Sequence, residues 1–91
     1  MNVHPPADTP RVTLTDIKEK IVHTRYVHDG LLTICILTLQ NGFKEVGTSA
    51  CAHLDLYNQG VGEQLAYDNA VNKLWKPLGY LLKERLHHDG N

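Results

Sequence analysis

The pattern of apolar and polar positions is clearest between residues 31 and 51, where two apolar runs flank Asn41-Gly42. Asn-Gly between such runs is a strong hairpin signal, because a type I′ turn needs positive φ at both of its central residues. The first run, residues 31–40, is aliphatic or β-branched at most positions, as expected of a strand covered on both faces. We therefore predict a β-hairpin whose second strand covers residues 43–50.

A two-residue turn determines the register of this hairpin and therefore the content of its two faces. The expected pairs are Thr38–Glu45, Leu37–Val46, Ile36–Gly47, Cys35–Thr48 and Ile34–Ser49. One face is then mostly apolar, with Cys35, Leu37, Leu39, Val46, Thr48 and Ala50. The other face mixes apolar and polar side chains, with Ile34, Ile36, Thr38, Glu45, Gly47 and Ser49.

A third strand is expected upstream of the hairpin. Residues 22–27 alternate with period two, and Asp29-Gly30 supplies a second tight turn. A two-residue loop at Asp29-Gly30 places Arg25 opposite Ile34, with His23 on the same face. The three strands then form an antiparallel meander whose mixed face contains both basic side chains.

Helices are expected before and after the three strands in the sequence. The first has Thr15 as its N-cap and Asp16 in its first turn. After the sheet, apolar residues recur at helical spacing over residues 62–75. Pro77 has no backbone donor, so we expect it to end this helix or to open a second one that reaches Leu86. The fold class is α+β: a short N-terminal helix, a three-stranded antiparallel β-meander and two C-terminal helices packed on one face.

The length of 91 residues allows one domain with one core. Residues 1–12 hold three of the four prolines and are expected to form a flexible arm, residues 13–86 the domain, and residues 87–91 a disordered tail. The arm lacks the leader of a secreted protein, and no apolar run is long enough to span a membrane. We therefore expect a cytoplasmic protein in which Cys35 and Cys51 are reduced, because they point to opposite faces of the hairpin.

The net charge is −1 with histidine neutral, and no run of Lys and Arg concentrates positive charge. This argues against bulk nucleic-acid binding and against binding to an anionic membrane, since both need a basic surface. A small anionic ligand held by one or two arginines is compatible with this charge. Because the predicted helices cover one face of the sheet, we expect the mixed face to pack against another subunit in an obligate homo-oligomer built from dimers.

Motifs of known chemistry are missing or weak. The chain contains no phosphate-binding loop, no dinucleotide fingerprint and no H-E-x-x-H zinc motif. Gly60-Val61-Gly62 alone is weak evidence for an anion site, and His87-His88-Asp89 is more typical of a solvated tail than of a metal site. A nucleophilic Cys35 or Ser49 would need His23 as its base, and no third group is arranged beside them. We therefore predict no catalytic residue, no metal and no cofactor.

Arg25 and Arg85 are the strongest candidates for a binding role. Arg25 projects from a strand between apolar neighbours, where a guanidinium is costly unless it meets a carboxylate or a phosphate. The alternative to a ligand is that Arg25 forms a structural ion pair with Glu45 on the mixed face. Four aromatic residues could stack on a base. They are Tyr57, Tyr67, Trp75 and Tyr80, of which Tyr67 and Trp75 belong to the apolar stripe expected to pack in the core.

A combination of short motifs over residues 15–86 resembles a widespread family of small tailed-phage proteins typified by podoviruses of enteric bacteria. The motifs are N-G-F, G-x-S-A-C, A-Y-x-N-A, a Trp and G-Y-L-L. The proline and phenylalanine that the family usually carries after the strands are replaced here by AHLDLYN, with Tyr57 as the nearest aromatic. The layout of a sheet followed by two helices also resembles the phage sponges that block Thoeris immunity.

The resemblance to these sponges implies a function in the cytoplasm of the infected bacterial host. Such proteins sequester cyclic ADP-ribose isomers without cleaving them, and some hold cyclic oligonucleotides at separate sites of a larger oligomer. An aromatic residue near the loop, an asparagine on the first long helix and arginines hold the ligand. The ligand-binding residues that this resemblance implies are Arg25, Tyr57, Asn69 and Arg85.

Three hypotheses of function are therefore open on the sequence. The protein is a non-catalytic sponge for a cyclic nucleotide signal, a decoy that binds and inhibits a host protein, or a small hydrolase that uses Cys or Ser with His23. The arginine among apolar residues favours the sponge. A decoy would more often show a large apolar patch or strong acidity, and neither is evident.

Overall fold

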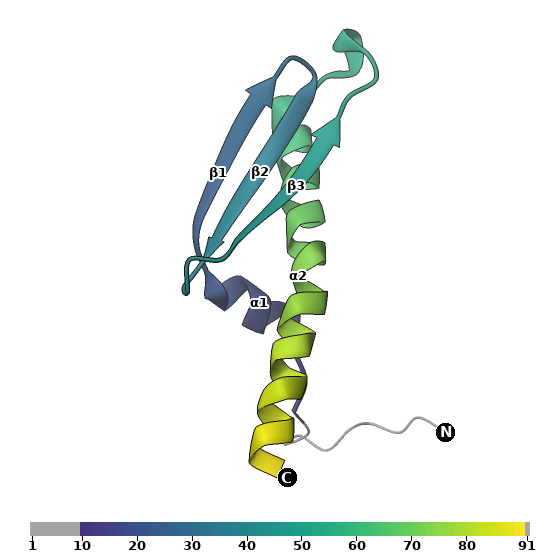
Figure 1. Ribbon diagram of the computed structural model, residues 1–91. Helices are drawn as coiled ribbons and strands as arrows, with labels where there is room; N and C mark the ends of the chain where they lie inside the picture. The colour runs from purple at the N-terminus through teal and green to yellow at the C-terminus, as the bar shows by residue number, and fades with distance from the viewer. Residues whose placement is uncertain (1–9, 91) are drawn as a thin grey trace, which may run out of the picture.

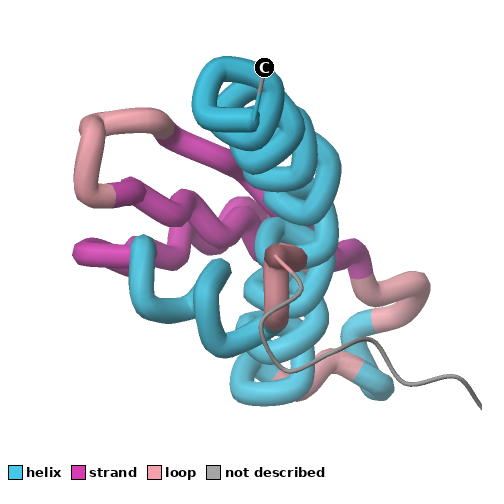
Figure 2. Tube along the Cα trace, turned by 90° about the horizontal axis from the view of Figure 1, so that it is seen from below, coloured by secondary structure: helices cyan, strands magenta, loops and turns pink. Residues whose placement is uncertain are grey.

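The computed structural model describes residues 10–90 and has one sheet and two helices longer than a single turn within that range. The elements are α1 (Leu14–Lys20), β1 (Ile21–Asp29), β2 (Leu32–Leu39), β3 (Lys44–Ala50), the 3-10 turn η1 (Leu54–Leu56) and α2 (Gln59–Gly90). The sheet is antiparallel in the order β1-β2-β3, and α2 packs along one face of it (Figure 1). In Figure 2, seen from below, most of the sheet lies to the left of α2, and one strand end emerges behind the helix on its right. The α+β class and the three-stranded meander are confirmed.

The helix α1 begins two residues before the predicted position. Thr13, not Thr15, is its N-cap: the Thr13 hydroxyl accepts a hydrogen bond from the Asp16 N–H (3.1 Å), and the Asp16 carboxylate accepts one from the Thr13 N–H (2.9 Å). This capping box satisfies two backbone donors at once. The hydrogen bond from the Thr13 backbone is the main reason why the pKa of Asp16 lies below its usual value.

The predicted register between β2 and β3 is wrong by one residue. Gly42 N–H donates to Leu39 O (2.9 Å) and Leu39 N–H donates to Phe43 O (2.8 Å), which closes a three-residue loop instead of a two-residue turn. Gly42 has φ +88° at the bulge position of this loop. Thr38 therefore pairs with Lys44. A slip of one residue turns every β3 side chain to the opposite face.

Gly47 shows the consequence of this register. It lies opposite Cys35 and is buried under α2, whereas we had predicted it on the mixed face. A Cβ on Gly47 would overlap the backbone of Ala66 and Ala70. The glycine thus allows α2, and not a second chain, to approach the strand.

The pairing between β1 and β2 also differs from the prediction, but by two residues, so each side chain stays on its predicted face of the sheet. Asp29 pairs with Leu32 across Gly30-Leu31, so the turn is not Asp29-Gly30, and Arg25 lies opposite Ile36 instead of Ile34. Arg25 and His23 remain on the face that points away from α2, as predicted. Glu45 and Ser49 are now on the helix face, so Glu45 is not the partner of Arg25.

The prediction of two C-terminal helices is wrong, because α2 is one helix of 32 residues that contains Pro77. Asn58 caps its start: the Asn58 side-chain oxygen accepts a hydrogen bond from Val61 N–H (3.0 Å). Pro77 costs the helix one hydrogen bond, to the carbonyl of Lys73. The buried leucines on either side of it, Leu74 and Leu78, hold both halves against the core.

The domain limits differ from the prediction at the C-terminal end, where α2 continues through the expected tail to Gly90. Most of the predicted arm, residues 1–9, lies outside the described residues. Val12, at the end of that arm, packs against the core.

The core lies between α2, α1 and the helix face of β2. Its residues are Ile17, Cys35, Leu37, Leu39, Ala66, Ala70, Val71, Leu74 and Leu78. Burial raises the pKa of the Cys35 thiol. The opposite face of the sheet is uncovered in the protomer, where Ile34 and Ile36 are half-buried and Val46 is 38% exposed.

Candidate functional site

The four predicted ligand-binding residues are spread over the protomer. Tyr57 lies just before α2, Asn69 is in its first half, Arg85 is near its end, and Arg25 is on the open face of the sheet. The helix rises about 1.5 Å per residue, so its axis carries Arg85 roughly 40 Å from Tyr57. A single chain therefore does not bring these four side chains around one nucleotide.

Two of the four already have partners within the chain. The Asn69 side-chain amide donates to the carbonyl of Thr48 (2.7 Å). The Tyr57 hydroxyl lies 3.2 Å from Nδ1 of His28. Among residues 10–90, no hydrogen bond or ion pair is formed by the side chain of Arg25 or Arg85.

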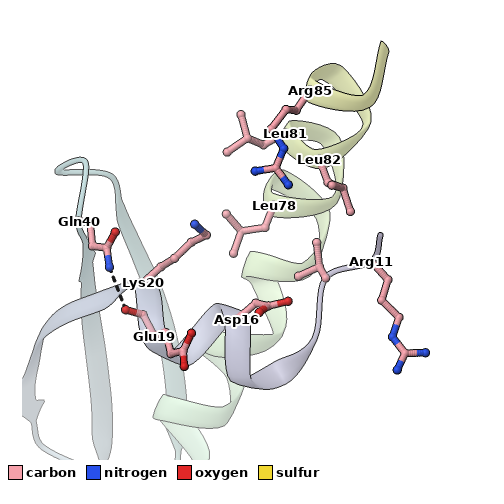
Figure 3. A pocket seen from close by; sticks show the side chains of 10 residues that line it. Arg11, Asp16, Glu19, Lys20, Gln40, Leu78, Leu81, Leu82 and Arg85 are labelled. Carbon is pink, nitrogen blue, oxygen red and sulfur yellow. Dashed lines mark hydrogen bonds between the residues drawn. The ribbon is translucent and has the colours of Figure 1, made fainter. Parts of the chain in front are cut away.

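Arg85 lines a hollow of about 290 Å³ between α1 and the second half of α2 (Figure 3). Its residues are Arg11, Val12, Asp16, Glu19, Lys20, Gln40, Leu78, Leu81, Leu82 and Arg85. In Figure 3 the guanidinium of Arg85 turns toward Leu78, and the side chain of Lys20 extends into the same space from α1, whereas Arg11 points away. The Gln40 amide donates to Glu19 O (3.0 Å), which leaves the side-chain oxygen of Gln40 as an acceptor.

An apolar and aromatic hollow of about 200 Å³ shares Leu78 and Leu81 with the first. It is lined by Leu39, Asn41, Phe43, Leu74, Pro77, Leu78, Tyr80 and Leu81. Phe43 is 45% exposed and Tyr80 66% exposed, so both rings are open to solvent. Lys20, Gln40 and Asn41 line a smaller hollow of about 90 Å³ that also contains Leu78 and Leu81.

These three hollows form one surface, which we call the Leu78–Leu81 groove after the two residues common to all of them. At one end lie the cations Lys20 and Arg85 with the acids Asp16 and Glu19, and at the other end lie its aromatic rings. The carboxamides of Gln40 and Asn41 lie between the two ends. Of the four predicted residues, only Arg85 belongs to this groove.

A second polar cluster lies at the other end of α2 and was missed from the sequence. His28 Nε2 is 2.7 Å from Glu63 Oε2, and His28 Nδ1 is 3.4 Å from the hydroxyl of the buried Thr33. With Glu63 as acceptor, a neutral His28 carries its proton on Nε2 and accepts at Nδ1. The two residues are 35 positions apart, so no local pattern relates them.

The register separates the residues that the hydrolase hypothesis combines. His23 is on the open face of the sheet, whereas Cys35 and Ser49 are on the face that α2 covers. His23 therefore cannot act as a base for either nucleophile within one chain.

The chain matches, over residues 9–86, the family model described as Phage protein (N4 Gp49/phage Sf6 gene 66) family. The chain belongs to this family. It is thus a phage protein, made in the infected host cell. No curated protein and no solved structure matches the chain. No helix within residues 10–90 has the length and hydropathy needed to cross a membrane.

Proposed function

We propose that this phage protein binds and sequesters a cyclic nucleotide immune signal, such as a cyclic ADP-ribose isomer, in the cytoplasm of the infected host. The observation that carries the proposal is the composition of the Leu78–Leu81 groove, with two cations at one end and two exposed aromatic rings at the other. A nucleotide presents the same two chemistries, phosphates and a flat base, within one small molecule.

Each part of the groove suits a part of such a ligand. The guanidinium of Arg85 can form two parallel hydrogen bonds with phosphate oxygens, and Lys20 adds a second positive charge. Phe43 and Tyr80 offer faces on which a base stacks. The Asn41 side chain supplies its amide N–H donors for the polar edge of the base or for ribose hydroxyls, while its oxygen already accepts from Phe43 N–H (3.0 Å).

Sequestration without cleavage is the activity that these side chains support. The two cations bind phosphate but provide no nucleophile. Of the two acids that line the groove, Asp16 is occupied by its hydrogen bonds with Thr13, and Glu19 lies at the same end as Lys20 and Arg85. A ligand held by stacking and by ion pairs is released intact when the protein unfolds.

The remaining predicted residues can take part only through an assembly. Arg25, Tyr57 and Asn69 lie outside the Leu78–Leu81 groove of their own protomer. For these residues to bind the same ligand, a homo-oligomer built from dimers must set them beside the groove of another protomer. The uncovered face of the sheet supports such an assembly.

The test is an incubation of the folded protein with cyclic ADP-ribose isomers, removal of free ligand, heating, and chromatography of the released material. We expect intact ligand from the parent protein. Arg85→Ala should weaken binding about tenfold to hundredfold, the effect of losing a charge-assisted contact. Lys83→Ala removes an exposed cation of the same helix outside the groove and should retain the parent affinity. Hydrolysed product, or no retained ligand, would contradict the proposal.

A second candidate function is the binding and inhibition of a host protein. The open face of the sheet favours it, since Ile34, Ile36 and Val46 are uncovered in the protomer. This function predicts that the protein retains no nucleotide and that substitutions on the open face, for example Ile36→Lys, abolish its effect in infected cells.

A further inference from the structure

The two edge strands of the sheet, β1 and β3, differ in whether their outward-pointing backbone groups have hydrogen-bond partners. At the β3 edge, α2 places side-chain donors on outward-pointing carbonyls: Asn69 Nδ2 donates to Thr48 O (2.7 Å), and Lys73 Nζ donates to Val46 O (2.8 Å). These bonds occupy backbone groups that could otherwise pair with another strand. The β3 edge is therefore closed.

The β1 edge has no such cover within residues 10–90. Asp29 pairs with Leu32 across a two-residue loop. Because hydrogen-bonded residues alternate along an antiparallel strand, the backbone groups of Asp29, Val27 and Arg25 bond to β2. The backbone groups of Thr24, Tyr26 and His28 consequently point outward, and no hydrogen bond among the described residues reaches them. The helix α2 packs mainly on β2 and β3 and reaches β1 through the side-chain contact between Glu63 and His28, which leaves the outward backbone groups of β1 open.

The sequence of β1 carries little of the usual protection of an exposed edge. With nine residues it is the longest strand of the sheet, and it contains neither proline nor lysine. Its one irregularity, the bulge between Ile21 and His23, lies at its start and leaves the rest of the strand regular. Such an edge is a template for pairing with another strand.

We infer that β1 pairs antiparallel with β1 of a second copy of this chain, on a two-fold axis that passes through Tyr26. This register pairs Tyr26 with its own copy and Thr24 with His28 of the second copy. All three outward-pointing residues then take part in the ladder. The product is a continuous six-stranded sheet with both copies of α2 on the same face.

Charge and ladder length together select this register over its neighbours. On the open face, His23 lies opposite Asp29 of the second copy, and Arg25 lies diagonal both to the same carboxylate and to Arg25 of the second copy. An axis at Arg25 would set the two guanidinium groups against each other, and an axis at Thr24 would set Arg25 against His23. An axis at Val27 would place Arg25 directly opposite Asp29, but it would set Thr24 against the turn residue Gly30 and so shorten the ladder.

Cysteine cross-linking tests the register directly, in a Cys51→Ser background that leaves only the buried Cys35. Hydrogen-bonded residues of an antiparallel pair have Cα atoms about 5.5 Å apart, within the range of a disulfide. Tyr26→Cys should therefore give a disulfide-linked dimer on mild oxidation. Thr24→Cys alone should stay monomeric on a non-reducing gel, whereas its mixture with His28→Cys should give a dimer. A dimer of Thr24→Cys alone would overturn the register.

A proline substitution tests the edge itself. Thr24→Pro removes an outward-pointing N–H without touching the bonds to β2, and prolines are tolerated on edge strands. By sedimentation at micromolar concentration, we expect the parent and the control Thr24→Val to be dimers and Thr24→Pro to be a monomer with an unchanged circular dichroism spectrum. A monomeric parent, or a Thr24→Pro variant that remains dimeric, would overturn the inference.

Discussion

The approach of α2 to β3 makes Gly47 the position where the smallest addition should have the largest effect. A Cβ there would lie 2.7 Å from the Cα of Ala70 and would also overlap the backbone of Ala66. Backbone atoms cannot rotate away as a side chain can, so the helix must move from the sheet. Overpacking of this kind costs up to about 3 kcal/mol. Replacing a strand glycine returns about 0.5–1 kcal/mol.

Gly47→Ala should therefore lower the free energy of unfolding by about 2 kcal/mol and the Tm by roughly 8–16 °C. Urea denaturation followed by circular dichroism measures the first value, and a thermal scan the second. All variants must be compared at one protein concentration, because the stability of an oligomer depends on it.

Gly79→Ala is the matched control. No atom lies within 4 Å of a Cβ at Gly79, which is in the interior of α2. This substitution should raise stability by about 0.5–1 kcal/mol, because glycine is a poor helix former. If Gly47→Ala were as stable as the parent, the register of β3 and the close packing of α2 described above would be wrong.

Three further predictions concern other parts of the fold. Asp16→Asn removes the carboxylate that accepts from the Thr13 N–H, so its stability deficit relative to the parent should be present above about pH 4 and should fade as the pH drops through the lowered pKa of Asp16, in urea titrations at several pH values; a deficit independent of pH would contradict the role of the Asp16 charge. Asn69→Ala should lower the unfolding free energy by about 1 kcal/mol, since it leaves Thr48 O without its donor; an unchanged stability with a weakened affinity for nucleotide would instead favour the ligand role implied by the sequence. Cys51 should react with a thiol reagent well before Cys35, whose thiol is buried and has a raised pKa; equal labelling rates, read by mass spectrometry of peptides, would show that the core opens easily.

The sequence predicts the fold class because its strongest patterns are local. Period-two alternation placed β1, and the mixed face of β1 and β2 was predicted correctly, since a shift of two residues in the loop does not change faces. The Asn-Gly signal at Asn41-Gly42 is ambiguous by one residue, because both a two-residue turn and a three-residue loop place the glycine at positive φ. This difference of one residue placed every side chain of β3 on the face opposite to the predicted one.

Pro77 illustrates how packing overrides a local signal. A proline after an amphipathic stretch favours a helix boundary, but Leu74 and Leu78 are both buried in the same core, so the helix continues through it. The small residues Ala66 and Ala70 on α2 match Gly47 on β3. Small residues that face each other allow a helix and a strand to pack closely, so this pair of segments in the sequence indicated that Gly47 faces α2.

The candidate site was predictable only in part. Arg85 was identified from the sequence as one of two arginines with a candidate binding role. Lys20 and Phe43 were not assigned to a site, and Tyr80 was named only as one of four aromatic residues that could stack on a base, because these residues come from α1, the β2–β3 loop and α2 and meet only in the folded chain. No periodicity within one segment relates such residues.

The most direct test of the central claim, that the Leu78–Leu81 groove holds the nucleotide, is a titration of isotope-labelled protein with a cyclic ADP-ribose isomer followed by amide NMR shifts. If the ligand binds in this groove, we expect the largest amide shifts on Lys20, on the loop from Gln40 to Phe43, and on α2 from Leu78 to Arg85. Shifts concentrated around Tyr57 and His28 at the other end of α2, or no shifts at saturating ligand, would contradict it.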